Sequence, residues 1–115
     1  MQALRTQIAS EPELIVMGWL TRNKIIFTFQ SWMAGGLYEL GGSVVDFTLD
    51  ELDIALRVMG EYWHRGILKS GQDLIQREML ISLGWTVVDL WEENIRDPAR
   101  LEQAMRLAIL GQEVL

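Results

Sequence analysis

The stretch Val58-Met59-Gly60-Glu61-Tyr62-Trp63-His64 marks the point where a strand-like run gives way to a helical pattern. It places the only histidine of the chain, a carboxylate and two aromatic side chains just behind a glycine. A preceding run, Val44-Val45-Asp46-Phe47-Thr48-Leu49, is also strand-like and carries an acid near its centre. Because burial of an isolated carboxylate is costly, an acid in mid-strand indicates a charged partner or a metal ion.

The elements around these two runs are predicted from apolar patterning and from end signals. Ser10 and Glu13 have the capping-box spacing ahead of a helix predicted over 12–22. Runs rich in β-branched and aromatic residues predict four strands, over 25–29, 44–49, 54–59 and 85–90. Further helices are predicted over 66–83 and from Asp97-Pro98 onward. This order predicts an α/β sandwich in which a helix crosses over to the fourth strand.

The connections and the second helix add detail to this prediction. Paired glycines bracket an irregular connection over 30–42, residues 50–53 form a turn, and a short acidic turn follows the fourth strand. Gly84 has the position of a helix C′ residue. The helix over 66–83 has an apolar stripe with neighbouring apolar positions, namely Leu68, Ile75 and Met79 with Leu74 and Ile81 beside them.

Length and composition limit the classes of protein to consider. The chain has 115 residues, half of them hydrophobic, which predicts a single domain over 1–115 with a packed core. No apolar run reaches the roughly 18 residues of a membrane span. The start of the chain lacks the order of a signal peptide, and there is no cysteine. We therefore expect a non-secreted, cytoplasmic protein without membrane association.

The charge distribution bears on nucleic-acid binding. The net charge of −6 counts against a simple electrostatic binder of DNA. However, Arg57, Arg65, Lys69 and Arg77 gather around the central motif, while acids are concentrated in the C-terminal third. A locally basic face on an acidic protein is therefore left open.

Side-chain alternation relates Asp46 to Arg57. Successive residues of a strand face opposite sides, so Asp46 and Thr48 share one face while Phe47 and Leu49 share the other. If the polar faces of the two strands coincide, Asp46 lies beside Arg57. The pair would then be a structural ion pair at the end of the sheet. This interpretation is an alternative to a metal site.

Three segments in the same order as in a known family carry a resemblance. They are Val45-Asp46-Phe47, Gly60-Glu61-Tyr62-Trp63-His64, and Gly84-Trp85-Thr86-Val87 followed by Trp91-Glu92. With the element order αβββαβα, they resemble the PD-(D/E)XK, restriction-endonuclease-like nuclease superfamily over residues 13–92. Within it the chain is most similar to very-short-patch repair endonucleases and related small domains of unknown function. The resemblance implies a mixed four-stranded sheet flanked by helices, and metal-dependent hydrolysis of DNA phosphodiester bonds.

The resemblance also implies a metal site and catalytic groups. Asp46 would be the principal ligand of Mg²⁺ or Mn²⁺, and the backbone carbonyl of Val58 a second. Glu13 would orient a metal-bound water, and His64 would assist at the phosphate. Hard oxygen ligands suit these cations, and the reaction requires a positioned water near the phosphorus.

DNA contacts follow from the same resemblance. Tyr62 and Trp63 match aromatic residues that press against bases or between them, which their flat faces allow. The basic residues that we assign to DNA contacts are Arg57, Arg65, Lys69 and Arg77. We expect DNA as the partner. A homodimer, or membership of a larger assembly, is left open.

The third strand departs from the family pattern. The usual signature has an acid and a lysine two positions apart, where this chain has Arg57 and Met59. Our hypothesis is that Glu61 supplies the missing carboxylate as a metal ligand and that Lys69 replaces the lysine. The alternative is a catalytically degenerate member of the fold that acts as a binding or assembly module, with Asp46 paired to Arg57. A third possibility is a nucleic-acid binder that reads structure without cutting.

Overall fold

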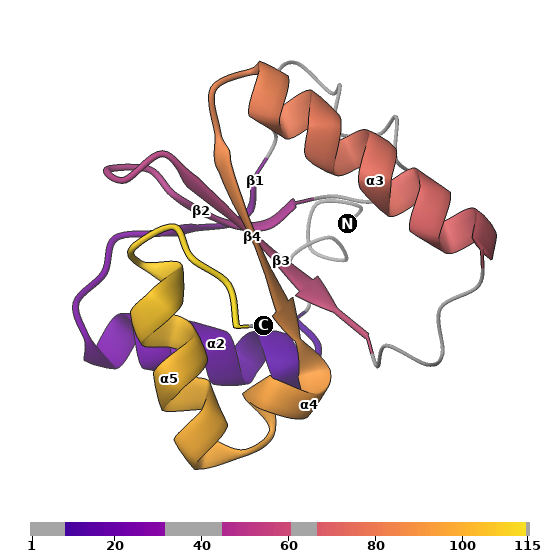
Figure 1. The fold of residues 1–115 in the computed structure, drawn as a ribbon. Helices are drawn as coiled ribbons and strands as arrows, with labels where there is room; N and C mark the ends of the chain where they lie inside the picture. The colour runs from indigo at the N-terminus through magenta and orange to yellow at the C-terminus, as the bar shows by residue number, and fades with distance from the viewer. Residues whose placement is uncertain (1–8, 32–44, 61–66, 115) are drawn as a thin grey trace, which may run out of the picture.

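Four helices and four strands make up the described part of the chain, which is residues 9–31, 45–60 and 67–114 of a computed structural model (Figure 1). The elements in chain order are α2 (Glu11–Arg22), β1 (Thr28–Ser31), β2 (Val45–Leu49), β3 (Ile54–Met59), α3 (Ile67–Ser82), β4 (Thr86–Trp91), α4 (Glu92–Ile95) and α5 (Pro98–Ala108). The predicted order αβββαβα is confirmed. The predicted acidic turn after the fourth strand is the short helix α4, which is a difference from the sequence analysis.

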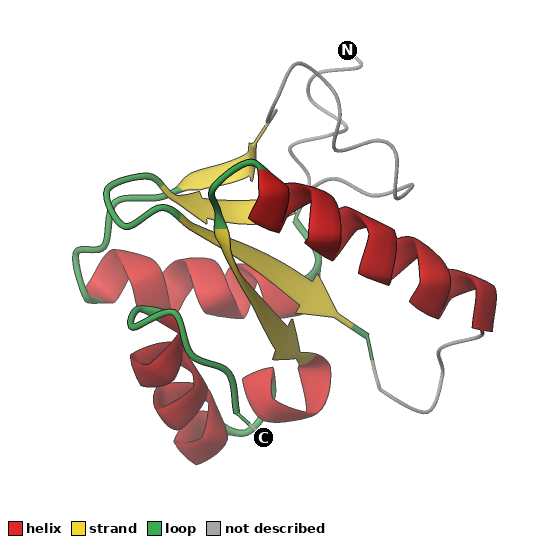
Figure 2. Cartoon of the chain, turned by 45° about the horizontal axis from the view of Figure 1, so that its top comes forward, coloured by secondary structure: helices red, strands yellow, loops and turns green. Residues whose placement is uncertain are grey.

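The sheet is mixed and has the strand order β1-β2-β3-β4 (Figure 2). β1 with β2 and β2 with β3 are antiparallel, whereas β3 and β4 are parallel. The parallel pair requires a crossover, which α3 provides. In this register Arg57 of β3 lies next to Asp89 of β4. The fold is therefore α/β, with a mixed four-stranded sheet flanked by helices, as predicted.

Helices cover both faces of the sheet (Figure 1). Of the helices in the described residues, α2, α4 and α5 lie on one face and α3 lies on the other. The main core fills the first face and includes these buried residues: Val16, Leu20, Phe47, Leu49, Leu56, Val88, Ile95 and Met105. On the second face a small cluster joins Ala55, Leu80 and Val87. The predicted alternation in β2 and β3 is thus confirmed, because Leu56 and Ala55 belong to clusters on opposite faces.

The two ends of α2 explain one success and one error of the sequence analysis. The capping box is confirmed, since the Ser10 N–H donates to Glu13 Oε1 at 2.8 Å and the Glu13 N–H donates to Ser10 Oγ at 3.3 Å. At the other end Lys24 adopts a left-handed φ of 58°, and the Ile25 N–H donates to the Leu20 carbonyl at 2.9 Å. This Schellman-type ending reverses the chain. The strand predicted over 25–29 therefore begins only at Thr28.

The buried face of α3 also differs from the predicted apolar stripe. Leu74 and Ile75 are 58% and 54% exposed, whereas Gln76 and Leu80 are buried. The reason lies in the sheet face that α3 covers, where Arg57 and its partners require polar contacts. Gln76 therefore turns inward, and apolar side chains of the stripe turn toward solvent.

Other predicted features are confirmed. Gly84 follows α3 with a φ of 97°, a value that L side chains rarely adopt, and Asp97 caps α5 through the backbone N–H groups of Ala99 and Arg100. Within the described ranges, no helix has both the length and the apolar character of a membrane span.

Candidate active site

Two acids from separate elements meet at one end of the sheet. Glu13 lies in the first turn of α2 and Asp46 is the second residue of β2. Their carboxyl groups share a hydrogen bond. The capping box fixes Glu13 at this position, because its Oε1 accepts the Ser10 N–H. The structure therefore brings together two of the predicted site residues, and Glu13 serves the helix cap and the carboxyl pair at once.

Asp46 also contacts the backbone of the neighbouring strand. Its Oδ2 accepts the Val58 N–H at 2.6 Å. The regular pairing of β2 and β3 ends at Phe47 with Leu56, so the carboxylate supplies the acceptor for the Val58 amide where the two strands separate. This bond holds the acid beside β3, at the point where its pairing with β2 ends.

The pair shifts the pKa of each acid in opposite directions. Burial is the main cause that raises the pKa of Asp46 to about 8, and the hydrogen bond with Glu13 raises it further. The Val58 N–H and the charge of Arg57 act in the opposite sense. For Glu13, burial acts to raise the pKa, but hydrogen bonds with Asp46 and Ser10 outweigh it and lower the pKa. At neutral pH the Asp46 carboxyl therefore donates its proton to a charged Glu13, and the two titrate as a unit.

Arg57 belongs to a different contact from the one predicted. The residue is buried, with 4% of its surface exposed. Nε and Nη2 bind the two carboxylate oxygens of Asp89 at 2.7 and 3.0 Å, and Nη1 donates to Gln76 Oε1 at 3.0 Å. The predicted Asp46–Arg57 ion pair is therefore wrong in its partner. Asp46 experiences Arg57 as a nearby charge and not as a hydrogen-bond donor.

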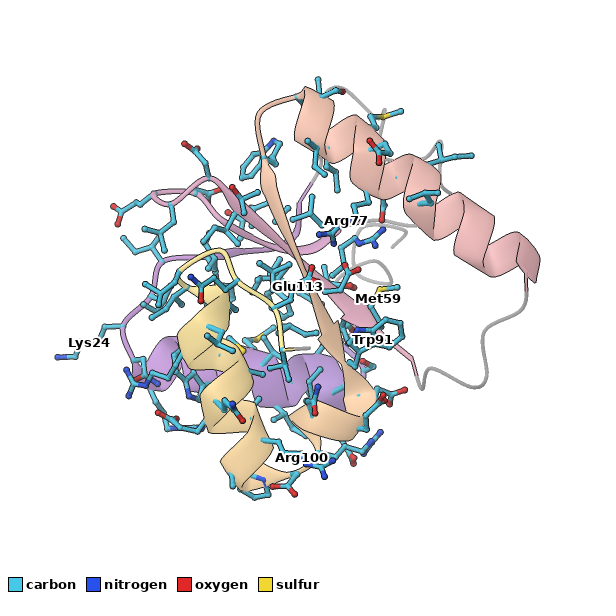
Figure 3. The ribbon with its side chains drawn as sticks, viewed as in Figure 1. Lys24, Met59, Arg77, Trp91, Arg100 and Glu113 are labelled. Carbon is cyan, nitrogen blue, oxygen red and sulfur yellow. The ribbon has the colours of Figure 1, made fainter. Side chains whose placement is uncertain are left out.

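A network continues from Asp89 to the end of the described chain. Arg77 Nη1 lies 3.2 Å from Asp89 Oδ2 and 2.8 Å from Glu113 Oε1. The same Glu113 oxygen accepts the Asp89 backbone N–H at 2.9 Å. Figure 3 shows Arg77 of α3 and Glu113 of the C-terminal segment directed toward one another. Arg77, assigned from sequence to DNA, is thus engaged in ion pairs, and its DNA contact stays a prediction.

Several predicted site residues lie outside the described residues. These are Glu61, Tyr62, Trp63, His64 and Arg65. The backbone of Lys69 is described, but its side chain is not. Their assigned roles therefore stay predictions. Among the described residues there is no group of three or more histidines or acids that is arranged to hold a metal ion.

Sequence reasoning missed the role of Asp89. The acid stands in mid-strand between Val88 and Leu90, which is the same signal that drew attention to Asp46. Its pairing with Arg57 depends on the parallel register of β3 and β4. Met59 and Trp91 are the last pair of that register and lie beside each other at the end of the strands (Figure 3).

Comparisons with known proteins agree with this architecture. No family model and no curated protein sequence matches the chain. Among solved structures, the chain is similar to the catalytic domain of the homing endonuclease I-Bth0305I, with a TM-score of 0.67 and 20% identity. The match covers 89% of this chain and 96% of that chain. At this identity the likeness concerns the fold, and the protein has a nuclease-like α/β fold.

Proposed function

We propose that this chain is a metal-dependent endonuclease domain that hydrolyses DNA phosphodiester bonds. The observation that carries the proposal is the Glu13–Asp46 carboxyl pair, which forms where β2 and β3 separate. The likeness to the catalytic domain of a homing endonuclease supports it, because that domain shares the arrangement of sheet and helices over most of both chains. Membership of the very-short-patch branch is part of the proposal.

The donor atoms at the pair suit a divalent cation. Two carboxyl groups that share one proton offer hard oxygen ligands once that proton leaves, and Mg²⁺ and Mn²⁺ prefer such ligands. Asp46 would bind directly, and Glu13 would bind through water. The Val58 carbonyl is a third donor, because the N–H and C=O of a strand residue point to the same side and its N–H reaches Asp46. Bound there, the cation would polarise the phosphoryl oxygen and acidify a water.

The protein's own residues have defined tasks in this proposal. Glu13, whose pKa is lowered by its hydrogen bonds, is charged at neutral pH and is able to orient an attacking water and accept its proton. We assign Glu61 as a further ligand, His64 and Lys69 to the phosphate and leaving group, and the rest of the segment to DNA. That last group is Tyr62, Trp63 and Arg65.

Cleavage assays test the proposal. The purified protein is incubated with plasmid and with mismatched duplex DNA in the presence of Mg²⁺ or Mn²⁺. We expect cleavage by the wild type and its loss in Asp46→Asn and Glu13→Gln. Glu11→Gln is the matched control, because Glu11 lies on the same turn of α2 but binds Arg96 instead. A folded wild type that cuts no DNA substrate, or an Asp46→Asn variant that cuts equally well, would contradict the proposal.

A second candidate, the catalytically degenerate binding module, has its own support. β3 has Arg57 and Met59 where the nuclease signature has an acid and a lysine. Five arginines of the described residues are already engaged in ion pairs, which leaves few charges for a duplex; they are Arg57, Arg77, Arg96, Arg100 and Arg106. This candidate predicts a folded protein that neither cuts DNA nor binds it with salt-sensitive affinity. Salt-sensitive binding without cleavage would instead identify the non-cutting nucleic-acid binder.

A further inference from the structure

We propose that the outer edge of β4 is a self-association surface for a second copy of this chain, and that the Glu113 carboxylate closes it. Within the described residues, β4 is the last strand of the sheet, so one side of its backbone has no neighbouring strand. An open strand edge of this kind is a template for pairing with another chain. Neither DNA nor a metal ion is needed for this pairing, which is therefore independent of the proposed function.

The backbone groups on the outer side of β4 belong to alternate residues. The Thr86 N–H donates to the Asp53 carbonyl at 2.9 Å, on the side of β3. Successive N–H groups of a strand point to opposite sides, so the next residue of β4 directs its N–H outward. The Asp89 N–H agrees with this alternation, because it donates to Glu113 outside the sheet. The outward groups of β4 thus belong to three residues, namely Val87, Asp89 and Trp91.

The segment after α5 returns along this edge (Figure 1). Gly111 adopts a left-handed φ of 75°, which turns the chain at the end of α5. A Cβ on Gly111 would lie 3.1 Å from Thr86 Cγ2, so the backbone passes close to the start of β4. Two residues further on, Glu113 reaches the Asp89 amide. The segment therefore follows the strand from its first residue to its centre.

One side chain makes the contact with the outer backbone of β4. Glu113 Oε1 accepts the Asp89 N–H at 2.9 Å and Arg77 Nη1 at 2.8 Å. Within the described residues no backbone–backbone hydrogen bond joins the segment to β4. Ile109 and Val114 pack against the main core and hold the segment on both sides of the contact. The Glu113 carboxylate thus occupies the place of a strand carbonyl at the centre of the edge.

β4 has none of the residues that usually protect an edge. Its sequence, Thr-Val-Val-Asp-Leu-Trp, favours a strand and contains neither proline nor lysine. Its acid, Asp89, does not present an unbalanced charge, because Arg57 and Arg77 both bind it. The protection of this edge therefore depends on Glu113.

A second copy fits the open edge through its own β4. An antiparallel pairing centred on Asp89 places Val87 opposite Trp91 of the second copy, so that outward backbone groups meet outward groups. The same pairing places Val88 opposite Leu90 of the second copy. Both of these side chains belong to the main core, so apolar residues meet on one face of the joined sheet.

Sedimentation velocity on the full chain tests the inference. We expect the wild type to be monomeric and Glu113→Ala to dimerise at least about tenfold more tightly, because the variant leaves the Asp89 N–H without its acceptor. Glu113→Gln is the matched control, since its amide oxygen still accepts that N–H. Its association should stay within about twofold of the wild type. The Glu113 side chain is 30% exposed, so neither replacement opens a cavity in the core.

Amide hydrogen exchange locates the interface. In the wild type the Asp89 N–H should be protected. In Glu113→Ala it should exchange faster in dilute solution and become protected again as the protein concentration rises. The Val88 N–H is the internal control, because it points toward β3 and should stay protected in every case.

Several results would overturn the inference. A wild type that dimerises as tightly as Glu113→Ala is one, and a Glu113→Gln variant that dimerises like Glu113→Ala is another. A dimer of Glu113→Ala in which concentration leaves the exchange of the Asp89 N–H unchanged contradicts the location at β4. Rapid exchange of the Asp89 N–H in the wild-type monomer rejects the closing role of Glu113 without any variant. DNA cleavage enters none of these measurements, so their outcome is separate from that of the proposed function.

Discussion

The Asp46 carboxylate accepts the backbone N–H of Val58 at 2.6 Å, just beyond the last regular pair of β2 and β3. An acid in this position replaces a backbone acceptor at the end of the sheet and so is held between two strands. Its other partner is Glu13, which arrives from α2. Burial disfavours the charge of such a carboxyl pair, so the pair lowers stability and is expected only where it serves a function. We therefore regard it as the chemical centre of the protein.

The raised pKa of Asp46 predicts how stability depends on pH. The pKa lies near 8 in the folded protein against 3.8 for the free side chain, so the folded state holds the extra proton between these values. The stabilisation from Asp46 is complete below about pH 4 and is lost as pH rises through 8, with a slope of up to about 1.4 kcal/mol per pH unit. Glu13, whose pKa is lowered, affects the pH dependence of stability only at the acid end of this pH range.

Denaturant unfolding of wild type and Asp46→Asn from pH 5 to pH 9 measures this effect. The free energy of unfolding of the wild type should fall relative to that of the variant as pH rises. Parallel pH profiles for the two proteins would show that Asp46 does not hold the proton.

The buried ion pair predicts a large loss of stability on truncation. Asp89→Ala removes the carboxylate that binds two nitrogens of the buried Arg57 guanidinium, which should lower the free energy of unfolding by about 3 kcal/mol. Arg100→Ala is the comparison, because Arg100 pairs with Asp97 at 4.0 Å on an exposed helix turn. It should cost less than about 0.5 kcal/mol. Equal losses in the two variants would show that burial does not decide the strength of the Arg57–Asp89 pair.

The orientation of α3 predicts a contrast between two leucines of one helix. Leu80 is buried against Ala55 and Val87, so Leu80→Ala should lower the free energy of unfolding by about 2–3 kcal/mol. Leu74 lies on the solvent side, and Leu74→Ala should change it by less than about 0.5 kcal/mol. Thermal and chemical unfolding measure both. A larger loss of stability in Leu74→Ala than in Leu80→Ala would show that the predicted apolar stripe of α3 faces the sheet.

Local signals in the sequence were sufficient for much of the fold. The capping box at Ser10, the turn residue Gly84 and the alternation in β2 and β3 act over a few residues, and each is confirmed. The start of β1 was missed because the chain reversal at Lys24 uses a residue other than glycine in a left-handed conformation. No common sequence signal announces that choice.

The candidate site was predictable only where signals local in the sequence identify its residues. Asp46 and Glu13 were recognised from position and resemblance, and the structure brings them together. The partner of Arg57 was not recognised from the sequence, because Asp89 becomes its neighbour only through the parallel register that follows the α3 crossover. That non-local contact also turns Gln76 inward and reverses the expected face of α3.

Proton release on cation binding tests the central claim most directly. Because Asp46 holds the shared proton at pH 7, Mn²⁺ binding to the carboxyl pair should release about one proton, and the release should fall toward zero above about pH 9. Titration calorimetry in buffers of different ionisation enthalpy measures this number. Release near one that disappears in Asp46→Asn is the result we predict. Binding without proton release, or no binding by the folded wild type, would contradict a metal site at Glu13 and Asp46.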